Sequence, residues 1–234
     1  MEEAGLSEPI LLAWSGGKDS ALALEALRGS PDFEVVELLT TVTEEDCRIA
    51  THGVRGELLR SQAESIGLPL STVLIPPEPS NEQYEQRMGT FLAAALSRGI
   101  RRVAFGDLFL RDVREYRERQ LVQAGMEPLF PLWGQDTTVL AQDFLRRGFR
   151  ATLVCVDTAV LAPSFAGRPF DVALLRDPPG VDPCGENGEV PFRQGGSSMW
   201  ERFCFRDFLV RHTEHGKRQT RRNSSTGTPV PAPK

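Results

Sequence analysis

Residues 11–27 read LLAWSGGKDSALALEAL, and this stretch predicts the first structural elements of the chain. An apolar run ends at Trp14, two glycines follow, and from Asp19 the apolar residues recur at helical spacing. This pattern indicates a strand, a tight turn and a helix. Gly16 and Gly17 permit backbone angles closed to other residues and let a ligand approach the main chain. Because the start of a helix offers N–H groups and a partial positive charge, the stretch predicts an anion-binding turn.

Two common nucleotide-binding loops are excluded by the spacing. In a Walker loop, glycine and lysine are followed by serine or threonine, but Asp19 follows Lys18, and Leu12 stands where the first glycine belongs. The dinucleotide fingerprint also fails, because Lys18 and Leu22 occupy its later glycine positions. The remaining alternative to an anion site is a plain strand-to-helix turn with a glycine hinge.

Downstream of this turn, strands and helices are expected to alternate. Strands are predicted at 33–42, 70–75, 101–105 and 149–156, a short extended piece near 128–131, and helices at 55–66, 80–98, 112–124 and 136–147. Such alternation favours an α/β fold with a parallel sheet and helices on both faces. Ligands bind beyond the carboxyl ends of such strands, so the loops after residues 14, 42, 105 and 156 should face one crevice.

Composition narrows the class of protein. The chain has 234 residues, of which 40% are hydrophobic, and this suits one domain with a full core. A net charge of −5 argues against a nucleic-acid partner, and the apolar runs are too short to cross a bilayer. Residues 1–8 are not typical of a secretory segment. With no C-x-x-C pair, a reducing, cytoplasmic setting is expected; the cysteines are Cys47, Cys155, Cys184 and Cys204.

The motif SGGKDS at residues 15–20 resembles the pyrophosphate-binding loop of the N-type ATP pyrophosphatases. Five further segments follow in order: RIATHGVRGELLRSQAESIGLPL, FGDLFLRDVREYRERQL, PLFPLWGQDT, SFAGRPFD and GVDPCGENGE. Together they resemble the diphthine–ammonia ligase (diphthamide synthase) related family, and most of all its bacterial adenine nucleotide alpha hydrolase-like members. The resemblance covers residues 10–189.

The resemblance implies a Rossmann-like core at about 10–125 and a smaller C-terminal lobe at about 126–195. It also implies ATP and Mg²⁺ as cofactors, and partners that are a carboxylate-bearing acceptor and ammonia. Members adenylate a carboxylate, that of diphthine on elongation factor 2, and ammonia then displaces AMP. The residues it implies for the nucleotide are Ser15, Gly16, Gly17, Lys18, Asp19, Ser20, Gly106 and Asp107.

Several of these residues have two interpretations. Lys18 fills the variable position of the motif, so it either adds a cation to the site or points to solvent. Asp19 either binds magnesium or orders the loop. Asp107 either meets the nucleotide or metal, or caps the next helix. Arg55, at a helix start, is a candidate catalytic clamp for a phosphate or a substrate carboxylate.

The segment CGENGE at residues 184–189 is the second candidate site. Glu186 and Glu189 place two carboxylates in one tight loop, where they can bind magnesium, hold ammonia or accept its proton. Asn187 can bridge them by hydrogen bonding. The alternative is an acidic surface turn.

After Glu189 the sequence departs from the family, whose members continue with a short polar and apolar strand. This chain reads EVPFRQGGSSMWERFCFRDF instead. Skipping one nucleotide in codons for Val190–Pro191–Phe192 restores Phe-His-Ser, so we hypothesise a frameshift that replaced the C-terminus. Resequencing the gene tests this. Residues 196–234 are expected to be a disordered or non-native tail.

Three functions follow from these observations. The favoured one is an ATP-dependent, AMP-forming ligase that activates a carboxylate for amidation. The second is an adenine-nucleotide-binding module without turnover, which single-turnover AMP formation would distinguish. The third is a tRNA-modifying or thiolating ATP pyrophosphatase, which predicts a reactive cysteine pair and a basic RNA-binding face.

Overall fold

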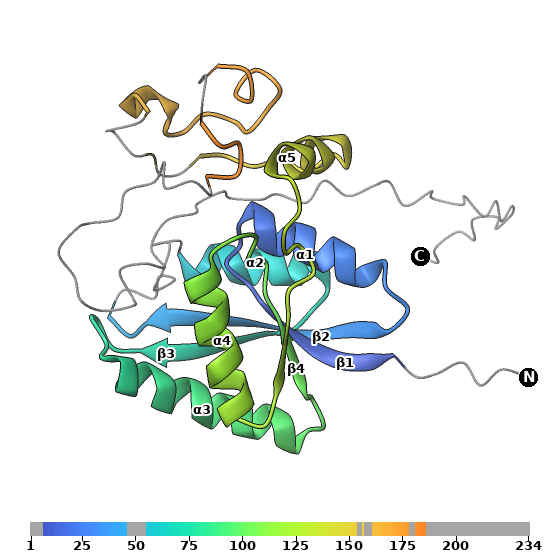
Figure 1. Ribbon diagram of the computed structural model, residues 1–234. Coiled ribbons are helices and arrows are strands. Elements are labelled where there is room, and N and C mark those ends of the chain that lie inside the picture. Colours follow the sequence, from blue (N-terminus) through green and yellow to red (C-terminus); the bar gives the residue numbers. More distant parts are fainter. Residues whose placement is uncertain (1–6, 46–54, 154–155, 157–160, 178–180, 186–234) are drawn as a thin grey trace, which may run out of the picture.

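The computed structural model describes residues 7–45, 55–153, 156, 161–177 and 181–185. Their centre is a sheet of five parallel strands in the order β3-β2-β1-β4-β5 (Figure 1). The strands are β1 (Glu8–Ala13), β2 (Phe33–Thr43), β3 (Leu70–Ile75), β4 (Arg102–Ala104) and β5 (Glu127–Leu129).

Helices cover both faces of the sheet (Figure 1). They are α1 (Lys18–Arg28), α2 (Gly56–Ile66), α3 (Asn81–Ser97), α4 (Arg111–Gln123) and α5 (Thr137–Arg146), followed by the 3-10 helix η1 (Pro163–Phe165). One core cluster unites the sheet with α1, α2 and α5. The other unites it with α3 and α4.

The central strand β1 is buried on both faces, which explains why its sequence is a continuous apolar run. Successive side chains of a strand point to opposite faces. Accordingly Ile10 and Leu12 join the core beneath α1, whereas Leu11 joins the core beneath α3. Leu12 pairs in register with Leu38 of β2 on one side and Ala104 of β4 on the other.

Local signals set the helix boundaries where the sequence predicts them. The Ser80 hydroxyl accepts a hydrogen bond from the Gln83 N–H, and the Gln83 side chain accepts one from the Ser80 N–H, so a capping box starts α3 close to the predicted boundary at residue 80. α2 ends at Gly67, whose φ of 78° is the left-handed conformation that glycine adopts most readily.

The order of the strands indicates where a ligand is expected to bind. From β1 the chain moves to β2 and β3 on one side, and then crosses to β4 and β5 on the other. The order therefore reverses between β1 and β4, and the carboxyl ends of these two strands flank the place where ligands bind in such sheets. The predicted α/β, Rossmann-like fold is confirmed.

Of the strand predicted at 149–156, the described residues 149–153 and 156 do not join the sheet. In the part of this segment that the structure describes, Thr152 makes an isolated antiparallel bridge to Pro169, and the Leu153 N–H donates to the Arg168 carbonyl. Phe149 and Leu153 pack into the core with α5. The segment is apolar because it packs on this helical layer, and an apolar run alone does not distinguish that packing from a buried sheet strand.

The helices within the described residues are too short, or too polar, to cross a bilayer.

Candidate functional site

The loop between β1 and α1 is a tight turn closed by its own hydroxyl groups. Gly16 has a φ of 75°, and Gly17 is the extended N-cap of α1. The Ser15 hydroxyl accepts a hydrogen bond from the Gly17 N–H at 3.2 Å and lies 3.3 Å from the Ser20 hydroxyl, which donates to the Gly17 carbonyl at 2.9 Å. Both serines therefore shape the turn.

The start of α1 supplies main-chain donors to this turn. The first intrahelical hydrogen bond runs from the Ala21 N–H to the Gly17 carbonyl. The N–H groups of residues 18–20 precede that bond, and the helix dipole adds a partial positive charge at the same point. This arrangement at the carboxyl end of β1 is suited to phosphate oxygens.

Lys18 is fully buried, so the alternative that it points to solvent is wrong. Its ammonium pairs with the Asp19 carboxylate, whose side chain is 13% exposed. Burial lowers the pKa of Lys18, but the charge of Asp19 and the neighbouring Cys184 outweigh this effect, and the net pKa is raised above the ordinary 10.5. Lys18 is thus a charged group inside the structure, between Asp19 and Cys184.

The loop after β4 lies directly against the loop after β1. A Cβ atom on Gly106 would lie 2.8 Å from the carbonyl carbon and oxygen of Asp19 and 3.0 Å from the Ser20 nitrogen. Real Cβ atoms do not approach main-chain atoms so closely, so only glycine fits at this position. The two loops that the sequence assigned to the nucleotide are therefore in contact.

Asp107 follows this glycine and faces Arg117 of α4. The Arg117 Nε lies 2.7 Å from the Asp107 Oδ2 without being aligned for a hydrogen bond, and a second guanidinium nitrogen donates to Oδ1 at 3.4 Å. The guanidinium also lies 4.2 Å from the centroid of the Phe105 ring. α4 begins after Leu110 without a side-chain cap, so the expectation that Asp107 caps this helix is not met.

A second arginine of α4, Arg114, lies between two aromatic rings. Its guanidinium carbon is 4.8 Å from the centroid of Phe130 and 4.6 Å from that of Trp133, and its Nε donates to Glu118 at 2.7 Å. Trp133 packs edge-on against Phe130. Trp133 therefore packs against both Phe130 and Arg114.

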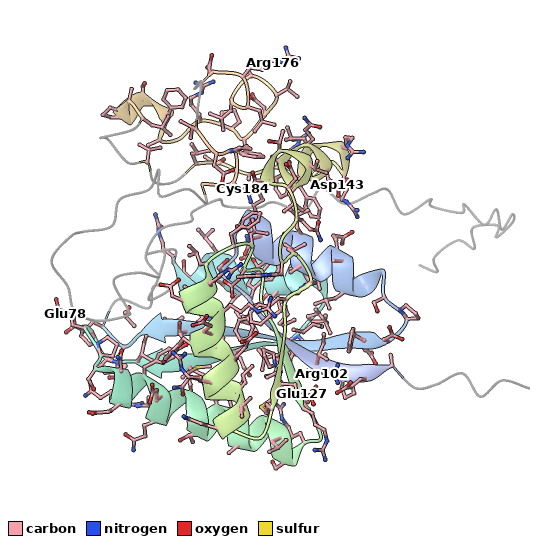
Figure 2. All side chains as sticks on the ribbon, viewed as in Figure 1. Glu78, Arg102, Glu127, Asp143, Arg176 and Cys184 are labelled. Carbon is pink, nitrogen blue, oxygen red and sulfur yellow. The ribbon has the colours of Figure 1, made fainter. Side chains whose placement is uncertain are left out.

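The described end of the C-terminal segment contacts the start of α1 through Cys184, which in the sequence is one of four widely spaced cysteines. Figure 2 shows Cys184 between this segment and α1. Its thiol interacts with Lys18 and donates to the Thr137 carbonyl, at the start of α5, at 3.3 Å. The Asp182 carboxylate accepts from the Cys184 N–H at 3.0 Å and fixes the turn. Cys184 therefore links three separate elements.

Cys184 should make stability depend on pH. Burial, opposed by the Lys18 ammonium, raises the pKa of the thiol from 9.0 to about 11. The unfolded chain then releases this proton near pH 9, whereas the folded chain keeps it to about pH 11, so stability is lost as the pH rises between these values. We expect the free energy of unfolding to fall by about 2–3 kcal/mol from this group.

Urea unfolding between pH 8 and 11, with a reductant and a chelator, measures this effect. In Cys184→Ala the free energy of unfolding should depend less steeply on pH between 9 and 11. Some dependence remains, because other groups also titrate in this range. Equal slopes for the two proteins would contradict the assignment.

The remaining candidates are Arg55 and three residues of the CGENGE segment. Arg55 is exposed at the N-cap of α2. Glu186, Asn187 and Glu189 lie outside the described residues, directly after the turn that Cys184 anchors. Arg55 was predicted as catalytic and stays a prediction, as do the three residues of the CGENGE segment.

A magnesium ion fits this loop only as a partner of the phosphates. Among the described residues, no group of three or more His, Cys, Asp or Glu side chains could hold a metal. Magnesium commonly binds through one or two carboxylates together with substrate phosphates. Asp19, at the N-terminus of α1, offers one such carboxylate, so the donor set fits an ion that arrives with ATP.

Comparison with known proteins agrees with this geometry. Residues 9–128 match the family model described as the diphthamide synthase N-terminal domain. The match spans just over half of the chain and includes both contacting loops, α2 and α4. A comparison with curated proteins finds no significant match.

Proposed function

The chain belongs to the diphthamide synthase family, a family of ATP-using ligase type, and on this premise we propose that it adenylates a carboxylate for amidation. The products are AMP, pyrophosphate and an amide. The observation that carries the proposal is the amide-lined turn at the start of α1, which is in contact with the loop after β4 at the point where the strand order reverses.

The proposed reaction has two steps. A carboxylate oxygen of the acceptor attacks the α-phosphorus of ATP, the bond to the bridging oxygen of the β-phosphate breaks, and pyrophosphate leaves. Ammonia then attacks the acyl carbon, AMP leaves with the acyl–oxygen electron pair, and one proton is released. Catalysis of the first step depends mainly on positioning and on stabilising the charge that develops on pyrophosphate.

The roles of the loop residues follow from where they lie. The main-chain N–H groups of residues 18–20 hold the β- and γ-phosphates. The hydroxyls of Ser15, which accepts from the Gly17 N–H, and of Ser20 keep the turn in shape. Lys18 contributes its charge from inside the structure, where it is buried against Asp19. Magnesium, when bound, neutralises phosphate charge, and Asp19 is the residue that would hold it.

The acceptor side is assigned to Arg55, Glu186, Asn187 and Glu189. In this proposal Arg55 holds the acceptor carboxylate or a phosphate. Glu186 and Glu189 hold ammonia and take its proton, and Asn187 orders them. Supporting this, the turn at residues 181–185 brings the chain to the phosphate loop immediately before Glu186.

The thiolating alternative receives no support from Cys184, the free cysteine within the described part of the chain. Thiolation needs an accessible thiolate. The Cys184 thiol is buried, and its pKa of about 11 keeps it protonated at neutral pH.

Single-turnover product analysis tests the proposal. Purified protein in excess over α-³²P-labelled ATP, with magnesium, ammonium and carboxylate candidates, should form AMP and not ADP. Formation of ADP would contradict the proposal. Binding of ATP without turnover under all these conditions would favour the nucleotide-binding module instead.

A further inference from the structure

Gln62 of α2 reaches the phosphate loop from outside it. Its Nε2 donates to the Gly16 carbonyl at 3.1 Å, and its Oε1 accepts from the Trp14 indole N–H at 3.1 Å. The helix also packs closely against the loop: a Cβ atom on Gly16 would lie 2.7 Å from both Gln62 Oε1 and Leu59 Cδ2. One side chain thus joins the end of β1, the loop and α2.

The two hydrogen bonds fix which way the Gln62 amide faces. An indole nitrogen can only donate and a carbonyl oxygen can only accept. The oxygen of the amide must therefore face Trp14, and its nitrogen must face Gly16. The Trp14 indole and the Gly16 carbonyl therefore hold the Gln62 amide in one orientation.

Holding the Gly16 carbonyl has a direct consequence for Gly17. In a planar trans peptide the carbonyl of one residue and the N–H of the next point in opposite directions. The described peptide bonds are all trans. Because Gln62 holds the Gly16 carbonyl toward α2, the Gly17 N–H faces away from α2, on the side of the Ser15 hydroxyl that accepts from it.

We propose that Gln62 is a positioning residue that presets the loop for the β- and γ-phosphates of ATP, an inference that rests on the proposed function. Gly16 is flexible by itself, since glycine adopts positive φ without cost. The Gln62 bond selects one conformation of this glycine before ATP arrives. Preset donors bind and stabilise charge better than donors that must first be ordered.

Two substitutions of Gln62 separate its bonds. Gln62→Met removes both at nearly constant size, whereas Gln62→Glu keeps an acceptor for Trp14 and places a carboxylate oxygen against the Gly16 carbonyl. Both should weaken ATP and pyrophosphate binding roughly tenfold, the scale of one lost hydrogen bond. AMP lacks the two phosphates that the loop holds, so its affinity should not change. Ser61→Ala, an exposed position on the same helix, is the matched control.

Titration calorimetry with ATP, pyrophosphate and AMP separates the outcomes. If the wild-type protein bound neither ATP nor pyrophosphate, the proposed function itself would be overturned. Wild-type binding with unchanged affinities in Gln62→Met would overturn the role of Gln62 and leave the proposed function standing. Equal weakening of AMP would also overturn it, because that result indicates a general structural defect.

The Trp14 indole N–H gives a second, spectroscopic readout. The chain has three tryptophans, so the indole region of an amide correlation spectrum is simple, and Trp14→Phe assigns the resonance. Gln62→Met should shift the Trp14 resonance in the direction of a weaker hydrogen bond. Gln62→Glu keeps an acceptor for the indole N–H, so it should not shift the resonance in that direction. If Gln62→Met left this resonance in place, the bond on which the proposal depends would be refuted.

Discussion

Replacing Gly106 by alanine should weaken ATP binding and lower the rate of AMP formation about a hundredfold while the chain stays folded, because misplacing the reacting groups by about 1 Å can cost this much in rate. The added Cβ would lie 2.8 Å from the Asp19 main chain, and main-chain atoms cannot turn aside as a side chain can. The φ of Gly106 is outside the left-handed region, so alanine brings no backbone strain of its own. The effect is therefore a steric displacement of the phosphate loop.

Gly89→Ala is the matched control for this substitution. Gly89 lies within α3, and a Cβ atom there meets nothing within 4 Å. Alanine at such a site should raise stability by about 0.5–1 kcal/mol and leave ATP binding unchanged. Calorimetric titration measures affinity, and circular dichroism checks the fold. Wild-type affinity in Gly106→Ala would contradict the contact between the two loops.

Replacing Asp19 by alanine should destabilise the folded chain by about 3–5 kcal/mol, the scale expected when one partner of a buried ion pair is removed. Lys18 is fully buried, and its ammonium depends on the Asp19 carboxylate for compensating charge. The whole stability of a domain is commonly only about 5–15 kcal/mol, so this variant approaches the unfolding threshold. Loss of ATP binding in Asp19→Ala would then report on folding as well as on the site.

The double variant Lys18→Met with Asp19→Ala distinguishes the ion pair from other effects. It removes both charges, so it should be more stable than Asp19→Ala alone, although it changes the proposed nucleotide site as well. Urea unfolding of the wild type, the two single variants and the double variant gives the coupling free energy between the two residues. A double variant no more stable than Asp19→Ala would contradict the account of the pair.

Much of the fold could be predicted because its signals are local. The glycine pair before α1, the capping box at Ser80 and the glycine after α2 each act within a few residues, and the structure confirms the elements that they delimit. The prediction failed at 149–156, where an apolar segment packs on a helical layer instead of joining the sheet. The domain division near residue 125 and the tail at 196–234 stay predictions.

The contacts that complete the site could not be predicted in the same way. Gln62 meets Gly16 across 46 residues, and Cys184 meets Thr137 across 47. Asp107 pairs with Arg117 because α4 folds back over the end of β4. Such pairings depend on how the elements pack and leave no periodic pattern, so the sequence indicated the loop itself but not the side chains that hold it.

The most direct test of the central claim is an amide correlation spectrum recorded while pyrophosphate and magnesium are added to the protein. The claim is that the turn at residues 15–20 binds the pyrophosphate half of ATP. It predicts that the largest shifts fall on the amide groups of Lys18, Asp19 and Ser20, and that Gly106→Ala abolishes them. Shifts centred elsewhere in the chain, or none at saturating pyrophosphate, would contradict it.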